Sequence, residues 1–465
     1  MNTVSKKDTN FLLIINVILI IICIYFNLSL SIGFLVGICI TLSLLKIRGF
    51  RIKLLLQPML MGIKSCSAVL FIIALMGGTI AIWLASGIVP TIIYYGYNYI
   101  GEINFLFASF LIAGITSIFM GTALGTFSTI GMALFGLGIS LGIQKPMLLG
   151  AITSGVFLAD KISPISSLTN LTLKLNDISY KEYMKVSLRT VIPTIIICMI
   201  VFYYWGSQFT NELDINQIQE LQQGIKGTYN INTALLLFPL IIIVLAIKGV
   251  NIIYNMVFGI VGGALISLFV QKLALVNVIK AILFGYKADT SLLELNNLLQ
   301  GGGAMNMLEV IFIVILAVAL TSLFEGLNFF EPLVNNYINK AKTKGSLITR
   351  TAILSSALTV ITCDQTVGIL LPSKLLKDKY KSLGLKTSIL ARTISDSGTS
   401  IAPLMAWNVN AIIITSITGV SAMSYGIYTV LCYVIPLVTV MSAYLMNNKS
   451  LTNIEGNVIT KENKI

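Results

Sequence analysis

The chain has 465 residues, of which 56% are hydrophobic and 11% charged, and its formal net charge is +13. Its long apolar runs could not be buried in a soluble domain, so the composition predicts an all-α polytopic membrane protein. The sequence contains no histidine, which excludes HExxH metal sites, Ser/His/Asp triads and histidine proton relays and leaves carboxylates for proton transfer.

Apolar windows near the length of about 20 residues that a membrane-spanning helix needs recur along the chain. They cover residues 11–26, 30–45, 68–90, 191–205, 233–247, 256–270, 308–324 and 425–446. Lys6 and Lys7 precede the first window as in a signal peptide, but no small-residue cleavage site follows, so we expect this helix to be retained.

Basic residues cluster at 46–53, 174–189, 340–344 and 374–386, and the positive-inside rule assigns these loops to the cytoplasm. The same rule explains the net charge without nucleic-acid binding. The glutamine-rich linker 207–230 carries Glu212, Asp214 and Glu220 and is expected outside. The N-terminal residues 1–10 and the tail 447–465 are then cytoplasmic, in a multi-pass protein of the bacterial inner (plasma) membrane.

Two halves of the chain, residues 11–206 and 231–446, share ordered matches. LGIQK at Leu141 corresponds to LGLKT at Leu383, and TSG at Thr153 corresponds to DSG at Asp396. Each half would contain about five crossings and one re-entrant hairpin, at 104–141 or 346–374. Because an odd number of crossings inverts the second half, the pattern predicts two inverted-topology repeats with broken helices at the midplane, as in secondary transporters.

Pro164 and Pro403 are expected to break a helix in each half, and the freed carbonyls, together with hydroxyl and amide groups, suit small cations. Asp160, Asp364 and Asp396 are the leading carboxylates at membrane depth, where a charge is costly. The alternative for each is a structural role, such as an ion pair of Asp160 with Lys161 or of Asp396 with Arg392 four residues earlier.

The segment GTALGTFSTIG at residues 121–131 lacks a lysine, so it does not predict a phosphate loop. Thr126, Ser128 and Thr129 are candidates to line a hairpin at the site. The alternative is close helix packing by small residues.

Together, SGIVPTIIYYG, GTALGTFSTIG, ADKISPISSLTNL, DQTVGILLPSKLLKDKY and SDSGTSIAPLMAWN resemble the NhaC-type Na+/H+ antiporter family of the ion transporter superfamily. The resemblance implies a secondary active transporter, not an enzyme, that exchanges Na+ for H+ by alternating access without a cofactor. Related members couple such ions to small carboxylates such as malate and lactate. The lipid bilayer is the expected partner, and a homodimer is compatible with the resemblance.

The matching motifs carry over a candidate ion and substrate site. Its members are Asp160, Ser163, Pro164, Ser166, Thr169, Asn170, Asp364, Gln365, Asp396, Ser397, Gly398, Thr399, Pro403 and Asn408, with Na+ expected at Asp160, Asn170, Asp396 and Thr399. Ser167 and Thr366, which neighbour these residues in the chain, are further candidates.

The chain departs from the family pattern at three positions. Ser167 stands where the family usually has an acid, Leu168 where it has a threonine, and Ser395 where it has a glutamate. The two serines each remove a carboxylate near the expected site.

Three other functions are compatible with parts of this pattern. A Na+- or H+-coupled carrier or exchanger of a small organic acid or amino acid is the nearest alternative, because it would use the same fold. An intramembrane aspartyl protease would also need two membrane aspartates, but the chain lacks a GxGD sequence. A channel is disfavoured by broken inverted repeats.

Overall fold

The computed structural model describes residues 5–26, 28–96, 104–208, 215–248, 250–292, 295–296 and 299–444. Over these residues nine helices are long and apolar enough to cross a membrane, or up to eleven when each of two bent helix pairs is counted as one span. The predicted all-α polytopic architecture is thus confirmed.

The elements of the first half include both long helices and several short ones. They are α1 (Lys6–Tyr25), α2 (Leu30–Ile47), α3 (Ile52–Ser65), α4 (Ser67–Ala85), α5 (Ile88–Gly96), α6 (Phe105–Met120), α7 (Ala123–Thr126), the π-helical turn η2 (Phe127–Gly131), α8 (Met132–Ser140), α9 (Lys145–Val156), α10 (Ala159–Ile162), α11 (Ser167–Asn176) and α12 (Tyr180–Ser207).

The second half adds a small antiparallel strand pair to its helices. Its elements are α13 (Ile215–Thr228), η3 (Thr233–Leu236), α14 (Leu237–Ile247), α15 (Ile252–Phe269), α16 (Leu275–Phe284), β1 (Tyr286–Lys287), β2 (Gln300–Gly301), η4 (Met305–Met307), α18 (Leu308–Gly326), α19 (Glu331–Ile338), α20 (Lys344–Thr362), α21 (Gln365–Leu375), α22 (Lys377–Ser382), α23 (Thr387–Ile394), the π-helical turn η5 (Ser395–Thr399), η6 (Ala402–Leu404), α24 (Val409–Thr418), α25 (Ala422–Tyr425), η7 (Gly426–Tyr428) and the C-terminal helix Val430–Tyr444.

Several apolar windows have a different course from the straight spans expected. The window 68–90 is interrupted after α4, because Gly87 adopts a positive φ of 76°. The windows 233–247 and 425–446 belong to bent pairs, with bends of 91° and 54°. The linker 207–230 contains the helix α13; its acids Glu212 and Asp214 lie outside the described residues, as does the tail 447–465.

A helical hairpin forms where the first one was predicted. Gly121 ends α6 with a left-handed φ of 70°, and the side chain of Thr122 caps α7. The chain then returns through η2 and α8. A Cβ atom placed on Gly138 in α8 would lie 2.9 Å from Cε1 of Phe105 at the start of α6, so the two arms lie antiparallel.

The second hairpin has the same construction. Cys363 ends α20 with a φ of 60°, and Asp364 caps α21 by accepting a hydrogen bond of 2.9 Å from the backbone N–H of Thr366. Ser355 Oγ donates to the carbonyl oxygen of Gly368 at 2.6 Å, which joins α20 to the returning arm.

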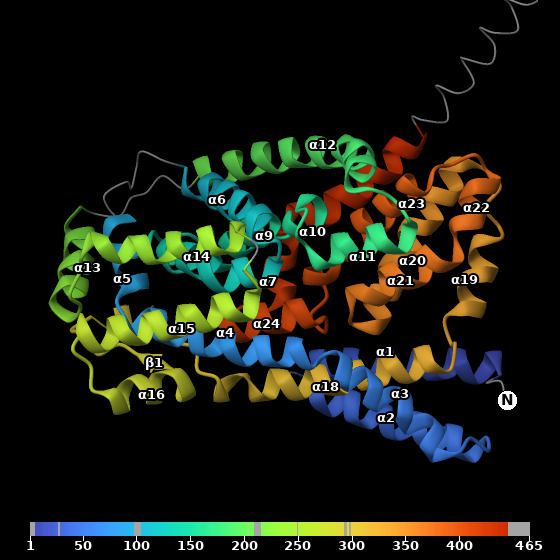
Figure 1. The fold of residues 1–465 in the computed structure, drawn as a ribbon, viewed down its shortest axis with the longest axis horizontal. Helices are drawn as coiled ribbons and strands as arrows, with labels where there is room; N and C mark the ends of the chain where they lie inside the picture. Colours follow the sequence, from blue (N-terminus) through green and yellow to red (C-terminus); the bar gives the residue numbers. More distant parts are fainter. Residues whose placement is uncertain are drawn as a thin grey trace, which may run out of the picture.

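Both helix breaks occur where the prolines predicted them. In the first, Ser163 is extended (φ −75°, ψ 126°) between α10 and α11. In the second, α23 passes into η5 and η6, and regular helix resumes at α24. Figure 1 shows α1, α2, α3 and α18 along one edge of the molecule and α12 along the opposite edge, with α10 and α11 between them.

The two breaks lie between two large clusters of buried apolar side chains. One cluster includes residues of α6, α8, α9 and the C-terminal helix, and the other includes residues of α1, α2, α18 and α20. At the end of α11, the Asp177 carboxylate forms an ion pair of 2.5 Å with Lys377 of α22. The halves are thus in contact both at this ion pair and around the breaks.

Candidate functional site

Hydroxyl groups of the first break hydrogen-bond to the side chain and to the backbone of Asp160. Ser166 Oγ donates to Asp160 Oδ1 at 3.1 Å, and Thr169 Oγ1 donates to the carbonyl oxygen of Asp160 at 3.2 Å. Ser163 Oγ donates to the carbonyl oxygen of Ile118 near the tip of the first hairpin, at 2.6 Å. All four predicted site residues here are buried.

The second break buries Asp396 completely, in the π-helical turn η5. Its Oδ2 accepts hydrogen bonds from Thr190 Oγ1 (2.8 Å) and Thr439 Oγ1 (2.6 Å), and Arg392 Nε lies 4.0 Å from the same oxygen. The ion pair considered for Asp396 and Arg392 is therefore present. Asp396 Oδ1 has no hydrogen-bond partner within the described chain, so one carboxylate oxygen is free to bind another group.

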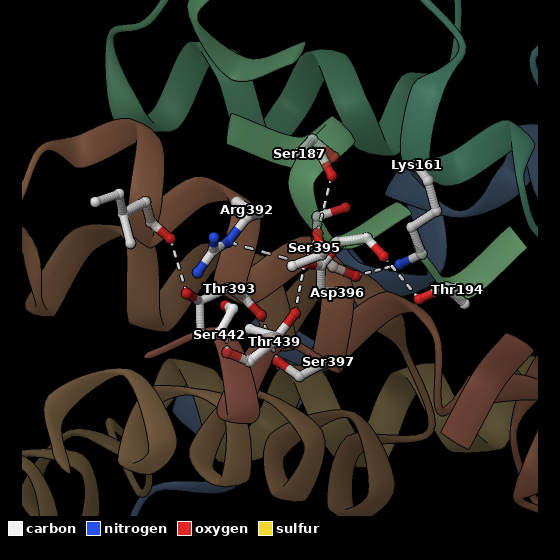
Figure 2. Close-up of polar contacts among 12 residues, drawn as sticks. Lys161, Ser187, Thr194, Arg392, Thr393, Ser395, Asp396, Ser397, Thr439 and Ser442 are labelled. Carbon is white, nitrogen blue, oxygen red and sulfur yellow. Dashed lines mark hydrogen bonds and ion pairs between the residues drawn. The ribbon is translucent and has the colours of Figure 1, made fainter. Parts of the chain in front are cut away.

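Lys161 connects the two breaks. Its side chain is 0% exposed, and Nζ donates to the carbonyl oxygen of Ser395 and to Thr399 Oγ1. Figure 2 shows Lys161 and Arg392 approaching η5 from opposite sides, with Asp396 between them. The expected alternative, an ion pair of Lys161 with Asp160, is not among the ion pairs of the described residues.

Tyr183 of α12 completes this contact. Its hydroxyl group makes hydrogen bonds with the carbonyl oxygen of Lys161 (3.0 Å) and with Ser395 Oγ (2.9 Å). Ser395 thus lies at the boundary of the two halves, where it contacts Tyr183 and Lys161. Buried polar groups of this kind are stable only when they are hydrogen-bonded.

The tip of the second hairpin supports η5 from the other side. Gln365 Nε2 donates to the carbonyl oxygen of Thr399 at 2.6 Å, and Asn408 Nδ2 donates to that of Cys363 at 3.0 Å. Asp364 and Thr366 form the cap of α21 and are partly buried, and among the described residues neither forms a hydrogen bond or ion pair with Asp396.

The remaining predicted residues have local roles. Ser167 and Asn170 are exposed, and Asn170 Nδ2 donates to the carbonyl oxygens of Pro164 and Ser166, which stabilises the first break. Ser397 Oγ donates to the carbonyl oxygen of Thr393.

Gly398 lets η5 approach α20 closely. A Cβ atom at this position would lie 2.1 Å from Ser355 Oγ.

Hydroxyl groups of the first hairpin bond to their own helix. Thr126, Ser128 and Thr129 donate to carbonyl oxygens three or four residues earlier, at 2.8–3.0 Å. Ser128 and Thr129 also line a cavity of about 170 Å³, together with Trp83 and Lys145. Among the described residues, neither of these two hydroxyl groups forms a hydrogen bond with Asp160 or Asp396.

Three residues of the site were not predicted from the sequence. Thr190 and Thr439 lie in apolar helices, where a threonine commonly satisfies its hydroxyl group by bonding to a carbonyl oxygen one turn earlier. Tyr183 lies in a lysine-rich segment that reads as a cytoplasmic loop, although its side chain is fully buried. Of these three residues, only Tyr183 had a sequence signal, and a weak one, because a tyrosine side chain is large and amphipathic.

Comparison with known proteins shows that the sequence is similar to antiporters. The sequence model described as the Na+/H+ antiporter family matches residues 155–445. The Na+/H+ antiporter NhaC of Alkalihalophilus pseudofirmus is 30% identical over 391 residues, 84% of each chain. NhaC of Bacillus subtilis is 29% identical, covering 85% of this chain and 88% of its own. The malate-2H+/Na+-lactate antiporter of B. subtilis is 29% identical over 81% of each chain.

Proposed function

The chain belongs to the Na+/H+ antiporter family, and from this membership and the geometry of the two breaks we propose that it exchanges Na+ for H+ across the bacterial plasma membrane by alternating access. The observation that carries the proposal is the fully buried Asp396, which lies where the two halves meet and has one carboxylate oxygen without a hydrogen-bond partner among the described residues.

Exchange follows from the cost of charge at this depth. A carboxylate that releases Na+ inside the protein is left with an uncompensated charge, which is expensive in a membrane. A proton is the smallest group that can replace the lost positive charge. Asp396 therefore binds Na+ and H+ alternately, so that each ion leaves only when the other arrives.

Oxygen atoms around η5 supply the other Na+ ligands in this proposal. The carbonyl oxygen of Ser395 and Thr399 Oγ1 face the same buried ammonium group, and hard oxygen ligands of this type suit small cations. Asp160 contributes a second carboxylate from the first break. Asn170 Nδ2 donates hydrogen bonds to the carbonyl oxygens of Pro164 and Ser166, and in this proposal its amide oxygen is a further Na+ ligand.

Alternating access rests on inverted repeats, for which the hairpins give support. At the tip of each hairpin a left-handed residue is followed by a capping residue, in Gly121–Thr122 and in Cys363–Asp364. The number of residues from the first tip to the second equals the number from LGIQK to LGLKT. Each hairpin tip also bonds to the break of its own half. We propose that residues 11–206 and 231–446 move relative to each other, with both termini cytoplasmic.

Coupling to a small carboxylate or amino acid is the second candidate. It is favoured by Ser167 and Ser395, which replace two acids of the family pattern, so a solute could bring the missing negative charge. The malate and lactate named for one relative, and the cavity beside Lys145, are compatible with this alternative.

Purified protein in sealed liposomes tests the proposal. An imposed Na+ gradient should drive an opposing change of internal pH without any organic solute, and Asp396→Asn should abolish it. The matched control is Asp378→Asn, an exposed acid of α22, which should exchange ions as the wild type does. Exchange that appears only after addition of a carboxylate or amino acid would favour the second candidate, and undiminished exchange by Asp396→Asn would contradict the role of Asp396.

A further inference from the structure

We infer that the ammonium group of Lys161 is a tethered cation that competes with Na+ for the oxygen atoms of η5, so that Na+ binds by displacing it. The inference rests on the proposed function and adds a residue and a binding mode to it. Lys161 is neither a carboxylate nor a group that the exchange step above uses.

The bonding partners of Lys161 are the first observation. Lysines are almost never fully buried unless they are paired with an opposite charge. Lys161 is 0% exposed, yet the groups that it touches by hydrogen bonds are a carbonyl oxygen and a hydroxyl group, both neutral. These are oxygen ligands of the type that bind a small monovalent cation.

The orientation of these oxygens is the second observation. Thr399 Oγ1 donates its hydrogen to the carbonyl oxygen of Ser395 at 2.7 Å, so only lone pairs of Thr399 Oγ1 are left to face Lys161. The carbonyl oxygen of Ser395 has no hydrogen to donate. Both atoms therefore present lone pairs to one point, and the ammonium group occupies it.

The charges around the site are the third observation. Lys161 and Arg392 carry two positive charges, and Asp160 and Asp396 carry two negative charges when ionised, so this buried group is neutral as it stands. A Na+ ion added beside the ammonium group would bring two like charges close together in a poorly screened environment. Binding of Na+ to these oxygens thus requires that the ammonium group move away.

A tethered cation also keeps the oxygens of η5 occupied in the part of the cycle in which Asp396 carries a proton instead of Na+. The oxygens of η5 always hold a positive charge, either Na+ or the side chain of Lys161.

The test is the Na+ affinity of purified protein in detergent, measured by titration calorimetry at one fixed pH. Lys161→Met removes the competitor and should tighten Na+ binding at least tenfold. Arg392→Met is the matched control, because it removes a buried positive charge 4.0 Å from Asp396 without touching Ser395 or Thr399. A purely electrostatic effect would tighten binding equally in both variants, whereas displacement predicts a clearly larger gain for Lys161→Met.

Loss of the gain in Lys161→Met/Thr399→Val would support the assignment of the oxygens. Unchanged or weaker Na+ binding by folded Lys161→Met, or equal gains in the two single variants, would overturn the inference. Lys161→Gln, which retains a donor for the carbonyl oxygen of Ser395, is measured if Lys161→Met does not fold. Failure of both to fold would make Lys161 a structural link and also overturn it.

Exchange by wild-type protein in liposomes separates the two proposals. If the wild type exchanges Na+ for H+ but the Lys161 variants show no gain in affinity, only the inference about Lys161 fails. If the wild type shows no exchange, the proposed function fails, whatever the affinities are.

Discussion

Replacement of Asp396 should destabilise the protein through the partner that it leaves behind. The carboxylate and Arg392 are 0% and 1% exposed and lie 4.0 Å apart. In Asp396→Asn the amide oxygen can still accept hydrogen bonds from Thr190 and Thr439, but Arg392 keeps its charge without compensation. Removal of one partner from a buried ion pair costs about 3–5 kcal/mol, and we expect a loss of free energy of unfolding in this range.

The double variant Asp396→Asn/Arg392→Met isolates the pair. Arg392 Nε and Nη2 have no hydrogen-bond partner in the described part of the chain, so removal of its charge orphans no group other than Asp396. The double variant should therefore lose less than the sum of the two single variants, by about 2–3 kcal/mol. Equilibrium unfolding in mixed micelles measures all four proteins, with Asp378→Asn as an exposed control that should stay within about 0.5 kcal/mol of wild type. Strictly additive losses would refute the reasoning.

Three further outcomes are expected. Gly398→Ala should lower the free energy of unfolding by about 1–3 kcal/mol, because the new Cβ atom would lie 2.1 Å from Ser355 Oγ. Adding Ser355→Ala should restore the melting temperature. If the double variant shows no rescue, this contact is not the cause of the loss. In a cysteine-free background, a cysteine at Ser207 should react with an impermeant maleimide from outside and one at Lys381 should not, whereas external labelling at Lys381 would refute the inverted topology. The hydrogen bond from Lys377 of α22 lowers the pKa of Asp177. The ion pair therefore stabilises the protein at pH 7, and this stabilisation is lost as the pH falls through the lowered pKa. Asp177→Asn should thus lower the melting temperature at neutral pH, with a difference that vanishes well below the ordinary pKa of about 3.9; a difference independent of pH would exclude the ion pair as its cause.

The sequence predicted the strongly apolar helices better than those that carry the site. Strongly apolar spans such as α2, α4 and α18 stand out by composition alone. The spans Lys145–Asn176 and Thr387–Thr418 are among the least apolar of the nine, because they contain the hydroxyl, amide and charged groups of the breaks. Their prolines and their matching order along the chain, rather than their hydropathy, predicted them.

Which acid belongs to the site depends on contacts that span the whole chain. Asp364 and Asp396 are both single acids in apolar surroundings, yet one caps α21 and the other is held by Thr190 and Thr439 from α12 and the C-terminal helix. The sequence contains no local signal for such a difference. The position of Lys161 could not be predicted either, because the neighbouring Asp160 offered a nearer partner than the carbonyl oxygen of Ser395.

The null point of coupled exchange tests the central claim most directly. Liposomes containing the wild-type protein are given a fixed Na+ gradient and a series of opposing pH gradients, and net Na+ flux is measured at each. Obligate exchange predicts that net flux stops at one balancing pH gradient and reverses beyond it, with no organic solute present. Na+ flux that runs down its own gradient at every pH gradient would contradict the account.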